Sequence, residues 1–255
     1  IRSALDIPIT GGSGVHVIAI NSVKSERVWP EELFPRLQLL GEIFVNAIER
    51  KQIRLEIQER LRFESLISDL STSFINLPAD RVDREINKGL RSITEFFNAD
   101  RCTIGLFSED RTRGTTAYEY HSAESEPGPE SSSKAQLPWY FEQLLRGKPV
   151  VMNRVDDLPP EAEKERHLCR VKNIKSLLSV PLISGEKILG PCALVVTRAE
   201  RVWPEALIRR FRLLTEVFAN ALERKRGEGN LQAKLQESEE RKQRLERAKM
   251  YHKRG

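Results

Sequence analysis

The chain has 255 residues, of which 39% are hydrophobic and 31% are charged, and its formal net charge is +5 at pH 7. This composition is ordinary for a globular protein, and no apolar run approaches the roughly 20 residues that a membrane-spanning helix needs. The excess of Lys and Arg could indicate nucleic-acid binding, but these residues are interleaved with Glu along helical stretches, as on solvated helix faces. We therefore expect no nucleic-acid partner and no membrane contact in these residues.

Near the start of the chain, the phrase ERVWPE begins at Glu26, and it occurs again at Glu200. The likeness continues through the residues that follow each copy. It also extends backwards, where IRSALDIPI at the first residue resembles IKSLLSVPL at Ile174. Internal repeats of this kind indicate repeated structural units. We therefore expect residues 1–51 to be the C-terminal remnant of one domain, and residues 61–226 to be a second, complete copy.

Each copy of the phrase predicts the start of an amphipathic helix, because Pro30 and Pro204 suit the first helical position, where a missing N–H costs nothing. Apolar residues recur at helical spacing after both prolines. The first helix is expected to continue through a charged helical linker at residues 52–60, which suits a coiled-coil connector. After the second helix, residues 227–255 are expected to form a charged, coiled-coil-like helical linker to a further output or sensor domain.

Between the two long helices, the pattern changes to strands, turns and shorter helices. Strands bounded by turn residues are expected at residues 101–107, 115–121, 149–153, 176–184 and 187–197. Shorter helices are expected at residues 83–98, 137–148 and 159–173. Residues 122–136, which are rich in Ser, Glu and Pro, are expected to form a flexible loop.

This order of elements resembles the GAF domains of bacterial sensor proteins. The resemblance is carried by ISDLSTSFINLPADRVDREINKGLRSITEFFNADRCTIGLF at the beginning of the domain and by SLLSVPLISGEKILGPCALVV near its end. It is strongest for GAF domains strung in series in multi-sensor histidine kinases of two-component systems. It covers residues 61–226 fully, and residues 1–51 as the last third of a preceding GAF domain.

The resemblance implies an α+β fold with a six-stranded antiparallel sheet and flanking amphipathic helices. The terminal helices are expected on one face of this sheet, where such domains commonly pair with a second subunit. A small-molecule pocket is expected on the other face. The partner that we expect is therefore a second copy of the chain, paired through parallel helices.

Groups that could carry catalysis are scattered along the chain. The histidines stand far apart, and neither a P-loop nor an HExxH motif occurs. A histidine kinase needs a phospho-acceptor histidine in a characteristic sequence, followed by an ATP-binding domain, and neither is found in this sequence. We therefore predict that this chain is non-catalytic, although the longer protein can be a histidine kinase. The cysteines Cys102, Cys169 and Cys192 form no CxxC pair, which indicates reduced thiols, a cytoplasmic location and no metal site.

The ligand signatures of known GAF domains do not match these residues. Cyclic-nucleotide GAF domains carry Asn-Lys and a following Phe after the last strand, whereas Thr197, Arg198 and Trp203 stand here. Bilin-binding GAF domains carry a Cys followed directly by His, whereas here His167 precedes Cys169. Haem ligation by His167 or His121 is a further possibility, and the alternative is that His167 lies at the solvent edge of a charged helix. The cofactor is therefore unknown.

An aromatic cluster in the second copy suggests a ligand-binding concavity. Aromatic side chains stand on the predicted short helix and on a neighbouring strand, and two arginines could meet an anionic ligand. The alternative is that the aromatic side chains belong to the core and that the arginines are ordinary surface charges. The candidate ligand-binding residues are Tyr118, Tyr120, Trp139, Tyr140, Arg154, His167, Cys169 and Arg170.

Two functions remain open from the sequence. One is a sensory module in which a small molecule in the second GAF domain changes the packing of the flanking helices. The other is a ligand-free module for dimerisation and transmission, in which the helices relay a signal generated elsewhere. Because the recognised ligand signatures are missing, the sequence alone favours the second.

Overall fold

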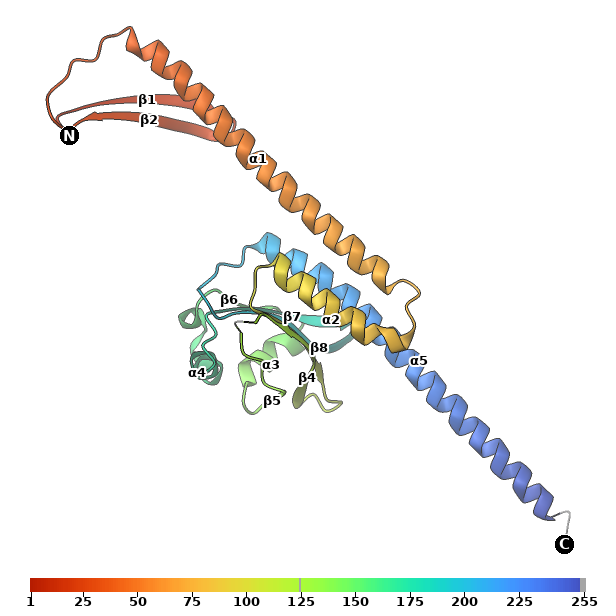
Figure 1. Cartoon of the computed structure of the whole chain (residues 1–255). Helices are drawn as coiled ribbons and strands as arrows, with labels where there is room; N and C mark the ends of the chain where they lie inside the picture. Colours follow the sequence, from red (N-terminus) through yellow and green to blue (C-terminus); the bar gives the residue numbers. More distant parts are fainter. Residues whose placement is uncertain (124, 253–255) are drawn as a thin grey trace. The chain divides into compact units, whose positions relative to one another are not determined.

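The computed structural model describes residues 1–123 and 125–252, and it divides into two compact units, Ile1–Glu64 and Ser65–Gly255 (Figure 1). The last residues of the predicted linker 227–255, from 253 onward, lie outside the described residues. Among the residues described, no helix combines the length and the apolar character that crossing a membrane requires.

The first unit is a β-hairpin that packs on the beginning of a long helix. Strands β1 (Ser3–Gly11) and β2 (Gly14–Ser22) pair in antiparallel fashion, and helix α1 (Leu33–Phe74) follows. A Cβ added at Gly41 would lie 2.5 Å from the side chain of Ile9, so only glycine lets helix and strand approach this closely. The small core of this unit consists of Leu5, Ile7, Ile9 and Val45.

The second unit contains the predicted six-stranded antiparallel sheet, which confirms the α+β, GAF-like fold class. The strand order is β5-β4-β3-β8-β7-β6. The strands are β3 (Arg101–Phe107), β4 (Arg113–His121), β5 (Ser131–Ser133), β6 (Val150–Met152), β7 (Ser176–Ser184) and β8 (Lys187–Val196). Strand β5 lies within the stretch predicted as a flexible loop. That prediction was wrong at these three serines, because they pair with β4.

Helices cover both faces of this sheet (Figure 1). Helices α2 (Ala79–Phe96) and α5 (Glu205–His252) lie side by side on one face, together with the last turns of α1. Helices α3 (Pro138–Leu145) and α4 (Glu163–Val171) cover the other face, with the short turns η1 (Val155–Asp157) and η2 (Pro160–Ala162) beside them.

Aromatic rings pack between the helices that lie on the α2–α5 face of the sheet. The rings of Phe97 and Phe211 meet edge to face with centroids 5.5 Å apart, and those of Phe74 and Phe218 do so at 5.9 Å. All four side chains are buried. Fully burying one such ring stabilises the fold by about 1.5–3 kcal/mol, so these contacts contribute substantially to the stability of the unit.

The second ERVWPE phrase fixes the start of α5. Trp203 is buried, its indole Nε1–H donates to Ser176 Oγ at 2.6 Å, and its backbone N–H donates to Asn153 Oδ1 at 2.8 Å. Helix α5 then begins at Glu205, one residue after Pro204, which the sequence predicted as the first helical residue. The tryptophan therefore ties the start of the helix to strand β7.

A buried carboxylate joins the end of β8 to the end of α2. Asp100 accepts hydrogen bonds from the Thr197 N–H at 2.6 Å and the Arg198 N–H at 3.2 Å, and it pairs with the Arg198 guanidinium at 2.5 Å. Burial by itself would raise the pKa of Asp100, but these hydrogen bonds and the Arg198 charge outweigh burial and hold the pKa below its usual value.

Replacing this carboxylate should destabilise the second unit. We expect Asp100→Ala to lower the free energy of unfolding by about 2–4 kcal/mol, because it leaves two backbone N–H groups without an acceptor. The folded pKa of Asp100 is depressed, so its stabilising effect is present above roughly pH 4 and is lost as the pH falls through the folded pKa. Urea denaturation from pH 3 to pH 7 should therefore show the difference between the two proteins shrinking in acid. Glu109→Ala, which removes an exposed carboxylate, is the matched control.

Candidate functional site

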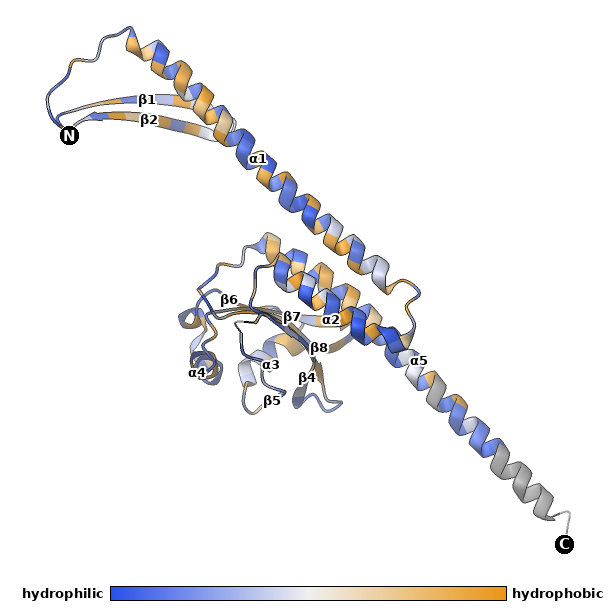
Figure 2. Ribbon diagram, viewed as in Figure 1, coloured by the Kyte–Doolittle hydropathy of each residue, from blue (hydrophilic) through white to orange (hydrophobic). Residues whose placement is uncertain are grey.

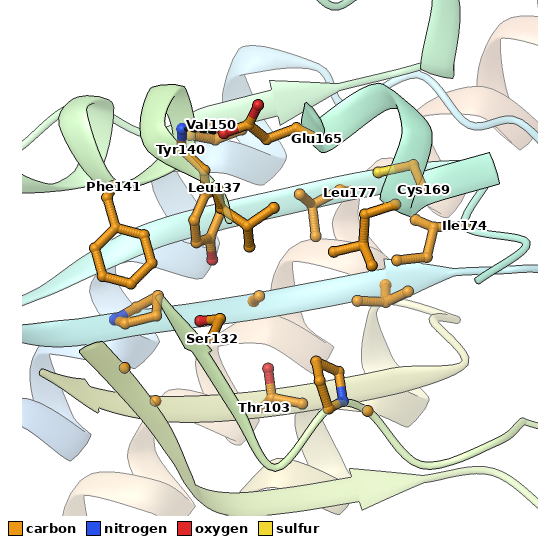
Figure 3. A pocket seen from close by; sticks show the side chains of 18 of the residues that line it. Thr103, Ser132, Leu137, Tyr140, Phe141, Val150, Glu165, Cys169, Ile174 and Leu177 are labelled. Atoms are coloured by element: carbon orange, nitrogen blue, oxygen red, sulfur yellow. Dashed lines mark hydrogen bonds between the residues drawn. The ribbon is translucent and has the colours of Figure 1, made fainter. Parts of the chain in front are cut away.

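A cavity of about 140 Å³ lies between the sheet and the covering helices α3 and α4 (Figure 3). Its walls are largely apolar, with Leu137 and Phe141 on one side and Ile174 and Leu177 on another. The hydroxyls of Thr103 and Ser132 are among its few polar groups. An apolar concavity with a small number of polar groups is the usual form of a small-molecule site.

Backbone forms part of the cavity floor. Gly105 of β3 lines the cavity, and Gly190 of β8 lies directly against the backbone of Gly105. A Cβ added at Gly190 would lie 2.1 Å from the carbonyl oxygen of Gly105, which no arrangement of the two strands accommodates. Only glycine therefore fits at position 190.

Tyr140 reaches from α3 across the cavity to the sheet. Its hydroxyl and the Ser179 hydroxyl of β7 lie 2.8 Å apart in a hydrogen bond. Burial raises the pKa of Tyr140 to about 12, so the phenol stays protonated at neutral pH. The uncharged side chain of Tyr140 therefore links α3 to strand β7 of the sheet.

Glu165 of α4 lines the same cavity and is 5% exposed. Its Oε1 accepts a hydrogen bond from the Tyr140 backbone N–H at 3.1 Å (Figure 3), in the first turn of α3, where the helix has no side-chain cap of its own. Its Oε2 is buried and has no hydrogen-bond partner among the described residues. A buried carboxylate oxygen without a partner is costly, and such a group calls for an explanation.

The sequence analysis missed Glu165 because it lies in a densely charged stretch, EAEKERHLCR. A signal was nevertheless present. Ala162 and Cys169 are buried, and Glu165 falls between them at helical spacing, on the same inward face. Placing Ala162 and Cys169 on the inward side of a helix would have predicted that Glu165 also faces the sheet.

Among the predicted site residues, Trp139, Tyr140 and Cys169 line the cavity. Burial, and then the neighbouring Glu165, raise the pKa of the Cys169 thiol to about 11. The other predicted residues lie elsewhere. His167 is exposed on the outer side of α4, and two exposed ion pairs occupy the arginines, Arg154 with Asp157 and Arg170 with Asp156.

Tyr118 and Tyr120 face the opposite side of the sheet, and a β-bulge is the reason. Ile104 pairs with Tyr118 but Gly105 pairs with Thr116, so Ala117 is an extra residue in β4. The bulge reverses the alternation of side chains, and only the part of β4 up to Thr116 lines the cavity. Strict alternation of side chains from Thr116 onward would have kept the tyrosines on the cavity face.

Comparisons with known proteins agree on one fold. Residues 82–222 match the sequence model of the GAF domain family. No curated protein matches the chain.

Three solved structures illustrate the likeness. A phycocyanobilin-bound GAF domain from a cyanobacterial phytochrome is 15% identical with a TM-score of 0.56, covering 65% of this chain and 96% of its own. The GAF domain of an Acinetobacter phosphoenolpyruvate-protein phosphotransferase is 13% identical with a TM-score of 0.53, covering 66% and 97%. The chromophore-binding domain of a Stigmatella aurantiaca bacteriophytochrome is 14% identical with a TM-score of 0.53, covering 63% and 60%. At these identities the likeness establishes the fold.

The raised pKa of the Cys169 thiol predicts slow alkylation. With a pKa of about 11, about one thiol in a thousand is ionised at pH 8. We therefore expect a small alkylating reagent to modify Cys169 more than about a hundredfold more slowly in the native chain than in the unfolded chain, as read by mass spectrometry of the peptides. Cys102 and Cys192, which are fully buried, serve as internal standards. Rapid labelling of Cys169 alone would contradict the prediction and would mark a thiol open to covalent attachment.

Proposed function

The chain belongs to the GAF domain family, and on that premise we propose that it is a non-catalytic sensory module of a bacterial two-component protein of the sensor histidine kinase type. In this proposal, a small molecule occupies the cavity under α3 and α4 and changes the packing of the helices on the other face. The observation that carries the proposal is the cavity itself, because it is lined mainly by apolar groups and because Glu165, one of its lining residues, has a carboxylate oxygen without a partner among the described residues.

A route from the cavity to the helices is available through β4. Thr116 lines the cavity, and beyond the bulge the Tyr118 hydroxyl donates to Asp83 of α2. Asp83 in turn pairs with Lys225 of α5, whose Nζ lies 2.5 and 2.6 Å from the two carboxylate oxygens. One carboxylate therefore joins the strand to both helices. A shift of β4 caused by a ligand would act directly on the position of α5.

The repeat supports a second proposal, that the first unit is part of a preceding GAF domain. Phe44 and Phe218 occupy the same position in the two copies, yet Phe44 is 59% exposed and Phe218 is fully buried. In the second unit, Phe74 and Gly89 cover Phe218. The first unit has no counterpart of α2 among its described residues. Exposure of Phe44 is what a domain lacking that helix would display.

We also propose that the chain forms a homodimer through parallel helices, in which the middle of α1 pairs with its copy. This segment has no counterpart in the GAF core, and apolar residues are interspersed with charged ones along it (Figure 2). Its exposed apolar side chains are Ile53, Leu55, Ile57 and Leu61, and those of Ile53, Ile57 and Leu61, spaced by four residues, lie on one side of the helix. Burying these three side chains against a second helix would remove apolar surface from water, which is the driving force of coiled-coil pairing.

The dimer proposal predicts that Leu61→Glu weakens self-association by at least about tenfold, because it places a charge in an apolar seam. Sedimentation equilibrium of both proteins measures the change. Gln52→Glu is the control, because it adds the same charge to an exposed position on the opposite side of α1. A monomeric unmodified chain, or equal effects of the two substitutions, would contradict a dimer held by this face.

A ligand-free dimerisation and transmission module is the alternative function. The size of the cavity favours it, because about 140 Å³ is less than the roughly 300–1,000 Å³ typical of ligand pockets. A cavity of this size takes a ligand about as large as benzene. A tetrapyrrole would require α3 and α4 to move away from the sheet.

Chain purified from its own host distinguishes the two functions. If the module is sensory, native mass spectrometry should show an added small mass that leaves when the chain is unfolded, and an absorption spectrum would report a chromophore. We expect the added mass and no visible band, because the cavity is too small for a pigment. A folded chain that carries no added mass, and that binds none of a set of benzene-sized molecules, would support the ligand-free alternative.

A further inference from the structure

Glu165 is a buried carboxyl group, and no basic side chain forms an ion pair with it among the described residues. Its Oε2 has no hydrogen-bond partner there. The basic side chains next to it on α4 are engaged elsewhere. Arg166 donates to the carbonyl oxygens of Leu158 and Pro159, and Lys164 donates to that of Ala135. A charge in this position destabilises the fold unless something else compensates it.

Capping of α3 accounts for only half of this carboxylate. The Tyr140 N–H binds Oε1, and the positive end of the helix favours a negative charge there. One acceptor would satisfy that N–H, and an amide oxygen would do so without the cost of a buried charge. The second oxygen and the charge itself therefore remain without a structural role.

The other buried charged group in the cavity lining has opposite charges beside it. Arg101 donates through Nη1 to the carbonyl oxygen of Glu126 at 2.8 Å, and the carboxylates of Glu119 and Asp100 both interact electrostatically with its guanidinium, although its Nε has no hydrogen-bond partner among the described residues. The carboxyl group of Glu165, unlike the guanidinium of Arg101, therefore has no opposite charge beside it among the described residues. The aromatic rings of Trp139, Tyr140 and Phe141 also line the cavity, and the faces of such rings attract cations.

We propose that the cavity binds a small primary amine with an apolar body, whose ammonium group donates to the carboxylate of Glu165. The apolar body would lie among Leu137, Ile174 and Leu177, where the cavity is lined by hydrocarbon. The volume of about 140 Å³ limits that body to about the size of a benzene ring. This inference rests on the proposed sensory function, because it names the ligand class of the same cavity. The amine would also join α4 to α3 through a single carboxylate.

Three probes of similar size test the ligand class on the full chain: benzylamine, benzyl alcohol and toluene, titrated at pH 7 and followed by NMR chemical shifts. Benzylamine is expected to bind at least about tenfold more tightly than benzyl alcohol, the weak end of what a hydrogen bond to a charged group contributes. The comparison uses the unmodified chain, so it does not depend on any variant folding.

Two variants of α4 test the assignment to Glu165. Glu165→Gln keeps an oxygen for the Tyr140 N–H but removes the charge, and it should abolish the preference for benzylamine while retaining binding of benzyl alcohol. Glu163→Gln removes an exposed carboxylate from the same helix and should leave the preference unchanged.

The outcomes separate this inference from the function on which it rests. Equal binding of benzylamine and benzyl alcohol would overturn the amine and leave the cavity as a ligand site. A preference that survives in Glu165→Gln would overturn the role of that residue. If the folded chain binds none of the three probes, both the amine and the ligand-sensing function are overturned.

Discussion

The packing of α2 and α5 on one face of the sheet is the interaction on which the rest of the second unit depends. Phe97 and Phe211 are buried and meet edge to face at the contact of α2 with α5, and Trp203 fixes the start of α5 through a hydrogen bond to Ser176 of β7. The shorter helices α3 and α4 cover the other face, and the cavity lies between them and the sheet.

The sequence predicted those elements whose pattern is local. Strands β3 and β7 have the expected bounds, because apolar and β-branched residues run between clear turn signals. Strand β5 was missed because its three serines carry no hydrophobic pattern, and only pairing with β4 makes them a strand. The site was predicted less well. Trp139, Tyr140 and Cys169 line the cavity, but the bulge at Ala117 turned the β4 tyrosines away, and the burial of Glu165 depends on contacts between helices that periodicity alone does not report.

The repeat shows how one local sequence acquires different environments. An antiparallel strand pair followed by ERVWPE and a helix occurs in each unit, as β1–β2–α1 and as β7–β8–α5. A helix follows the phrase both times, but it begins directly after Pro204 in the second copy and three residues after Pro30 in the first, where its first turn contains no acidic residue. What the helix buries differs, because burial is decided by elements far away in the chain. Leu40 is half exposed, whereas Leu214 at the same position of the second copy is fully buried.

The contact between Gly105 and Gly190 determines where such a domain can change its ligand. The sheet side of the cavity is built there from two backbones in contact, and any side chain at position 190 would push the strands apart. A side chain at position 190 would therefore destabilise the sheet before it altered the shape of the cavity. At this one place, a change in the cavity would have to come from the covering helices and not from the strands.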